Sequence, residues 1–125
     1  MNNEITISFE GDYVRAVANG EKNFDYQTEL WTRIVATCRE NECLNVLGVA
    51  YTTRPLRTME AYKTAELFRQ LGVTHEFRIA WIEKNPETYD TPYFVETVLV
   101  NRGFTARLFP DEAQALDWLR DNGEH

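Results

Sequence analysis

The sequence predicts an α/β fold with a mixed five-stranded sheet and about four helices. Three observations lead to it: an alternating segment with a Gly-Asp turn near the start, a nearly all-apolar segment in the middle, and helix-start and helix-stop signals between the later extended segments. The expected order is β-β-α-β-α-β-α-β-α. Helices between successive strands require crossover connections, so the later strands should be parallel and only the first antiparallel.

The opening segment is expected to form a β-hairpin. Residues 5–10 alternate between apolar and polar side chains, which is the period of a half-buried strand. Gly11-Asp12 follows as a turn, and residues 13–18 should return beside the first strand. Asp25 is a good N-cap residue, and apolar residues recur at helical spacing after it. We therefore expect a helix to begin there.

The middle of the chain predicts a central strand and a second helix. Residues 44–51 are nearly all apolar, and a strand that lacks a polar face is usually buried on both sides, as in a parallel sheet. A loop with Pro55 follows. Thr58 is placed to cap the next helix, which should run to Leu71 and stop at Gly72.

The next unit is a strand, a polar loop and a third helix. Residues 77–82 form the expected strand, and residues 83–90 the loop. Thr91-Pro92 is typical of a helix start, because proline in the first turn loses no hydrogen bond. Gly103 should end this helix.

The chain closes with a short strand and a fourth helix. The strand is expected at residues 104–109, and the helix at 111–119. Asp111 and Gln114 have the spacing of a cap pair, so the helix should begin at this aspartate. Trp118 and Leu119 are expected to pack the helix onto the sheet.

Length and composition indicate one domain over residues 1–125. Of the 125 residues 43% are hydrophobic, which is enough for a core and too many for disorder. The formal net charge is -7, and this argues against nucleic-acid binding, which needs Lys and Arg to neutralise phosphates. No apolar stretch approaches the roughly 20 residues that a membrane helix needs. The first residues lack the pattern of a signal peptide, so we expect a cytoplasmic protein without membrane insertion.

The two cysteines leave two interpretations open. Cys38 and Cys43 could form a redox pair or part of a metal site, or they could be two reduced thiols, one packed on a helix and one just before a strand. Neither His75 nor His125 is close in sequence. We therefore favour reduced thiols and expect no metal and no cofactor.

The residues at the two ends of the chain carry a family resemblance. Near the start, Tyr13-Val14-Arg15 follows the Gly-Asp turn and precedes Gly20-Glu21; near the end lie the segments 100–104, 107–109 and 111–119. In these features the chain resembles STAS domains of the SpoIIAA-like branch over nearly its whole length. The resemblance implies the STAS fold and a regulatory, protein-interacting role. These motifs are structural, so they specify the fold much better than an activity.

One family feature concerns phosphorylation. In the anti-sigma-factor antagonist branch, a serine after an aspartate at the start of the second helix is phosphorylated by a partner kinase. The corresponding segment here, residues 52–59, has no Asp-Ser and no following glycine. Thr58 is the nearest match by position and is the candidate phosphorylation site. An ordinary helix cap is the simpler interpretation of this residue.

The sequence offers no candidate catalytic residue. It has no G-x-S-x-G elbow, no P-loop and no G-x-G-x-x-G motif. His75 is expected in a loop before a strand, which is the end of a parallel sheet away from the usual site. We therefore expect a protein that is not an enzyme.

The expected site lies at the carboxyl ends of the strands, where open α/β sheets bind ligands. The loops and helix starts there carry tyrosines, a phenylalanine and arginines, and tyrosine and arginine are enriched at binding hot spots. Alternatively, these aromatic side chains only fill gaps beside the sheet. The candidate partner- or ligand-binding residues are Phe24, Tyr26, Tyr51, Arg54, Arg57, Tyr89 and Tyr93.

Three functions compete, and the third, an enzyme, is disfavoured because no nucleophile–base pair or metal set can be named. The leading one is a non-enzymatic regulatory module that binds a protein partner, or a second copy of itself, through the second helix and neighbouring loops. The alternative is a carrier or sensor of a small apolar or anionic molecule, held among the aromatic side chains and arginines. Lipid-carrying domains share the fold that the resemblance implies. The expectation of an apolar ligand is therefore based on analogy alone.

Overall fold

The computed structural model describes the backbone of residues 4–20, 24–52, 58–84 and 90–120. Side chains are described for residues 4–19, 25–51, 62–84 and 96–120.

The sheet has five strands in the order β1-β2-β3-β4-β5. They are β1 (Glu4–Phe9), β2 (Val14–Gly20), β3 (Asn45–Thr52), β4 (Arg78–Glu83) and β5 (Thr105–Leu108). β1 is antiparallel to β2, and each later pair of neighbours is parallel. The predicted mixed sheet is therefore confirmed, and the nearly all-apolar strand β3 lies at its centre.

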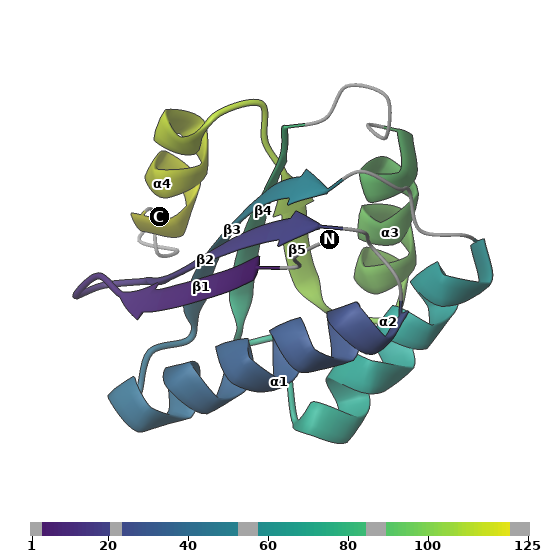
Figure 1. The fold of residues 1–125 in the computed structure, drawn as a ribbon, viewed down its shortest axis with the longest axis horizontal. Coiled ribbons are helices and arrows are strands. Elements are labelled where there is room, and N and C mark those ends of the chain that lie inside the picture. The colour runs from purple at the N-terminus through teal and green to yellow at the C-terminus, as the bar shows by residue number, and fades with distance from the viewer. Residues whose placement is uncertain (1–3, 21–23, 53–57, 85–89, 121–125) are drawn as a thin grey trace.

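The helices form two layers (Figure 1). α1 (Phe24–Asn41), α2 (Thr58–Leu71) and α3 (Asp90–Asn101) cover one face of the sheet, and α4 (Glu112–Arg120) covers part of the other. The crossovers between neighbouring parallel strands share one handedness, and the strands follow one another across the sheet in chain order. The three crossover helices therefore lie on the same face of the sheet. α4 follows the last strand and makes no crossover, so it is free to take the opposite face. The predicted element boundaries differ from these by one or two residues.

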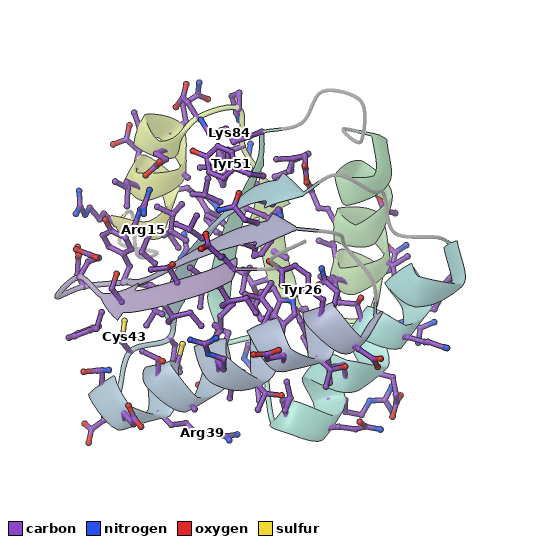
Figure 2. All side chains as sticks on the ribbon, viewed as in Figure 1. Arg15, Tyr26, Arg39, Cys43, Tyr51 and Lys84 are labelled. Carbon is purple, nitrogen blue, oxygen red and sulfur yellow. The ribbon has the colours of Figure 1, made fainter. Side chains whose placement is uncertain are left out.

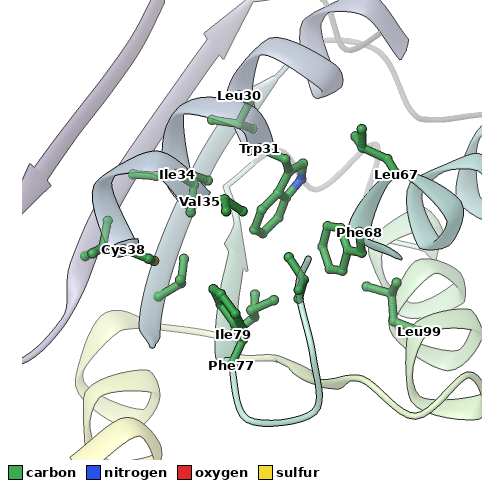
Figure 3. Packing of buried hydrophobic residues seen from close by; sticks show 14 of the residues in the cluster. Leu30, Trp31, Ile34, Val35, Cys38, Leu67, Phe68, Phe77, Ile79 and Leu99 are labelled. Atoms are coloured by element: carbon green, nitrogen blue, oxygen red, sulfur yellow. The ribbon is translucent and has the colours of Figure 1, made fainter. Parts of the chain in front are cut away.

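The larger core lies between the sheet and α1–α3 (Figure 3). Leu30 and Ile34 of α1, Val46 of β3 and Phe68 of α2 are fully buried there. The Trp31 ring lies edge-on to Phe68, at 4.6 Å between ring centres. This packing accounts for the apolar stripe that predicts α1.

The smaller core lies under α4. Leu47 and Val49 of β3 pack there with Ile82 of β4, and they meet Ala115 and Leu119 of α4. Successive side chains of a strand point to opposite faces, so β3 supplies Val46 to one core and Leu47 to the other. This confirms that β3 is apolar because both of its faces are buried.

α4 is capped and held at both ends. The Asp111 carboxylate accepts a hydrogen bond of 2.9 Å from the Gln114 backbone N–H, as the cap pair predicts. The Arg15 guanidinium pairs with Glu112 at 3.1 Å, and Arg120 pairs with Asp12 at 2.8 Å. Trp118 and Leu119 pack α4 onto the sheet as expected.

Two glycines end helices as predicted. Gly72 follows α2 and Gly103 follows α3, with φ angles of 86° and 92°. These angles lie in the left-handed region that glycine adopts without strain. Among the helices that the structure describes, none combines the length and apolar character needed to cross a bilayer.

Candidate functional site

Three side chains line up at the carboxyl ends of β2, β3 and β4, on the face that carries α4. Leu47 and Val49 of β3 pack under α4, so Tyr51, two residues further on, projects from the same face. Asn19 of β2 is its register partner. The Lys84 N–H donates a hydrogen bond of 2.8 Å to the Ala50 carbonyl, which places Lys84 beside Tyr51 on the next strand. We call Asn19, Tyr51 and Lys84 the carboxyl-end row.

Two side chains of the row, Tyr51 and Lys84, are open to solvent, and Asn19 is half-buried. Tyr51 near the end of β3 is 47% exposed, and Lys84, directly after β4, is exposed as well, although most residues before them in these strands are buried. Figure 2 shows the two labelled side chains together at this end of the sheet. Within the described part of the chain, neither side chain has a hydrogen bond, ion pair or ring contact. An exposed aromatic ring beside an unengaged cation is a surface that can bind.

Tyr26 lies at the same end of the sheet but on the opposite face. It is 5% exposed, and its hydroxyl donates to the Asn19 carbonyl and lies 3.1 Å from the Glu4 carbonyl oxygen. Burial raises the pKa of Tyr26 to about 12. The side chain thus joins α1 to the ends of β1 and β2, and its polar group is occupied by the protein itself.

Polar side chains are also buried inside the larger core near this end. Gln27, Thr64 and Glu83 are each less exposed than 7%. The Gln27 side-chain oxygen accepts a hydrogen bond of 3.3 Å from the indole N–H of Trp31, and both Thr64 and Glu83 interact with neighbours. These are partnered core groups. The described residues contain no cluster of three or more His, Cys, Asp or Glu side chains that could hold a metal ion.

The other sequence candidates are only partly described. Phe24 begins α1, and Tyr93 lies in the first turn of α3, but their side chains are outside the described residues. α2 begins at Thr58, as predicted from the sequence, and the side chain of Thr58 is outside the described residues as well.

Three further candidates, Arg54, Arg57 and Tyr89, lie outside the described residues altogether. Of the predicted set, the structure therefore locates the side chains of Tyr26 and Tyr51, and it places them on opposite faces of the sheet.

Asn19 and Lys84 were not predicted as site residues. The sequence feature that could have identified them is the alternation of side chains along a strand. Asn19 comes two residues after Val17, and Lys84 two residues after Ile82, so each lies on the α4 face. The sequence indicated that Lys84 belongs to a polar loop, and this interpretation concealed its position beside Tyr51.

The two cysteines lie at the end of α1. Cys38 is fully buried in the larger core, and Cys43 is partly buried just before β3. The Cys43 N–H donates to the Cys38 carbonyl at 3.0 Å across Glu42, whose φ is 51°, and this closes the helix as a Schellman turn. Burial raises the pKa of the Cys38 thiol to about 12. Cys38 is thus positioned as a core side chain.

Two solved structures share this fold over nearly the whole chain. One is an anti-sigma factor antagonist from Mycobacterium paratuberculosis, with a TM-score of 0.61, 13% identity and 96% of each chain covered. The other is an uncharacterized protein from Shewanella loihica with a SpoIIAA-like fold, with a TM-score of 0.54, 20% identity, and 94% of this chain and 93% of that chain covered. No family model and no curated protein sequence matches this chain. The chain has a SpoIIAA-like α/β fold, as the resemblance in its residues implies.

Proposed function

We propose that this chain is a non-enzymatic regulatory module that binds a protein partner through α2 and the neighbouring loops. The observation that supports this most is the likeness to an anti-sigma factor antagonist, which extends over 96% of both chains. An antagonist of an anti-sigma factor acts on another protein. A shared fold does not by itself imply a shared function. Support for a protein interface must therefore come from the side chains on the surface of α2.

The exposed side of α2 offers side chains suited to a protein interface. Tyr62 is 46% exposed, and the Arg102 guanidinium lies over its ring at 5.4 Å. Val100 of α3 is 50% exposed. Tyrosine and arginine supply much of the energy at protein interfaces, because each combines a large contact area with a polar group. Glu66 and Arg69 form an ion pair of 3.5 Å further along α2.

Site-specific photo-crosslinking in the native cell tests this proposal. A photoreactive amino acid replaces Glu66 on α2 in one variant and Glu29 on α1 in a matched control, since each glutamate is exposed and paired with an arginine of its own helix. We expect one discrete protein adduct from position 66, weakened by Tyr62→Ala, and none from position 29. Equal adducts from both positions, or none from α2, would contradict the proposal.

A second candidate function is the carriage or sensing of a small molecule. The observation that favours it is the carboxyl-end row, where Tyr51 and Lys84 are exposed and have no partner among the described residues. Native mass spectrometry of freshly purified protein tests it directly. A retained small molecule of constant mass supports the carrier, whereas bare protein from every preparation argues against it.

A further inference from the structure

We propose that the carboxyl-end row binds a small molecule in which an anionic group, a phosphate or a carboxylate, is attached to a flat aromatic body. This inference rests on the second candidate function and names the residues and the ligand chemistry for it. Lys84 would pair with the anion, Tyr51 would stack on the flat body, and the Asn19 amide would bond to a polar group at its far end.

The spacing of the row suits such a ligand. Neighbouring strands lie about 4.8 Å apart, so the three side chains rise from points that span roughly 10 Å. Asn19 and Tyr51 are register partners, and Lys84 lies one residue beyond the last register pair of β3 and β4, Ala50 with Glu83. A ring on Tyr51 thus leaves its anionic substituent within reach of the flexible Lys84 side chain.

The charges on this face single out Lys84. Among the described residues, the other strand cations of this face are engaged: Arg15 pairs with Glu112, and Arg78 donates to the Trp118 carbonyl and lies 4.3 Å from the centre of that ring. Arg107 of β5 lies over the Phe109 ring, at 5.3 Å from its centre. Lys84 has no such contact within the described residues. Its charge is therefore available for a charge-assisted hydrogen bond, the stronger kind of polar contact.

The two faces of the sheet differ at this end. On the α1–α3 side, Ala18 and Ala50 occupy the same level of the sheet and are covered, with exposures of 1% and 0%. On the other side α4 packs against β3 and β4, yet it leaves Tyr51 47% exposed. Ligands of open α/β sheets bind beyond the carboxyl ends of the strands, which is where the row lies.

The net charge limits the size of the anion. A protein with a formal net charge of -7 repels a polyanion such as a nucleic acid over a long range. A single anionic group next to one lysine meets an opposite charge at short range instead. The row therefore fits a small molecule with one charged group.

The experiment is a titration of the intact chain, followed through backbone amide shifts by NMR. The probes are phenyl phosphate and benzoate, which carry both ring and anion, with inorganic phosphate and phenol as single-feature controls. We expect saturable shifts at Asn19, Tyr51 and Lys84 with phenyl phosphate or benzoate, and binding at least roughly tenfold weaker with either single-feature probe. The stronger of the two ring–anion probes then tells which anion the row prefers.

Three variants locate the binding. Lys84→Gln and Tyr51→Leu should each weaken it by about tenfold, whereas Lys63→Gln, an exposed lysine of α2, should leave it unchanged. Each variant must first give the amide spectrum of a folded protein. The inference is overturned if neither ring–anion probe saturates, or if Lys84→Gln and Lys63→Gln weaken binding equally. A ligand retained in native mass spectrometry but unaffected by Lys84→Gln would overturn the inference too, yet it would leave the carrier function standing with its site elsewhere.

Discussion

The Trp81 ring occupies the space that a side chain on Gly48 would need. The two residues are register partners on β4 and β3. A Cβ atom built on Gly48 would lie 2.0 Å from the Cζ3 atom of Trp81 and 2.1 Å from its Cε3 atom. The indole also stacks on Trp31 of α1, with 5.5 Å between ring centres. The absence of a side chain at Gly48 thus allows the Trp81 ring to lie between the sheet and α1.

This contact predicts that Gly48→Ala destabilises the fold. The new methyl group must push a ring that is already stacked against Trp31, and overpacking of this kind costs about 1–3 kcal/mol or more. Urea unfolding, followed by far-ultraviolet circular dichroism, measures the loss of free energy of unfolding.

A double mutant separates this clash from other effects of the substitution. Trp81→Leu removes the ring, so Gly48→Ala should cost much less in the Trp81→Leu background than in the wild type. The cycle should give a coupling energy of about 1 kcal/mol or more. Additive effects of the two substitutions would show that the close approach to Trp81 is not the reason for glycine at this position.

A second prediction concerns the attachment of α4. Leu119 is 1% exposed and packs in the smaller core, so Leu119→Ala should lower the free energy of unfolding by about 2–5 kcal/mol. Leu116 is only partly buried against the same core, so Leu116→Ala is a matched control with a smaller effect. Chemical denaturation of both variants gives the comparison. Equal costs would mean that α4 is not held by its buried side.

The fold could be predicted because its strongest signals are local and agree with one another. The nearly all-apolar strand β3 required burial on both faces, and the structure buries it on both. Gly72, Gly103 and the Asp111 cap placed the helix ends. Which face α4 takes could not be read from the pattern, because no crossover constrains a helix after the last strand.

The site was harder to predict because exposure depends on contacts between distant segments. Tyr26 and Tyr51 have the same residue type and lie at the same end of the sheet, yet one is 5% and the other 47% exposed. The carbonyls of Glu4 and Asn19 occupy the hydroxyl of Tyr26, and only the folded hairpin brings them there. The sequence indicated that Lys84 lies in a polar loop, but it did not predict that Lys84 lies beside Tyr51 at the end of β4.

A third prediction separates the two thiols. Cys43 is partly exposed, and Cys38 is fully buried with its pKa raised to about 12 by burial, so a thiol reagent should modify Cys43 first in the native protein. Cys38→Ser should cost about 1–3 kcal/mol, because it buries a hydroxyl in an apolar site, while Cys43→Ser should cost less. Mass spectrometry after timed alkylation, together with urea unfolding, checks both. Equally fast modification of the two thiols would contradict the burial of Cys38.

The last prediction links Tyr26 to alkaline stability. Burial raises the pKa of Tyr26 from 10.0 to about 12, so between these values the unfolded chain releases a proton that the folded protein retains. The contribution of this group to stability is therefore complete below about pH 10 and is lost as the pH rises through about 12. Tyr26→Phe should lower stability by about 1 kcal/mol at neutral pH, because the hydrogen bond to Asn19 is lost.

The same variant should also flatten the alkaline part of the profile. The phenylalanine that replaces Tyr26 has no proton to release, so the difference in free energy of unfolding between wild type and Tyr26→Phe should shrink as the pH rises from about 10 to about 12. Urea unfolding across this range measures the difference. Tyr51→Phe is the matched control, since Tyr51 is 47% exposed and its hydroxyl has no partner among the described residues. A constant difference for Tyr26→Phe across the range would show that the buried hydroxyl does not set the alkaline limit.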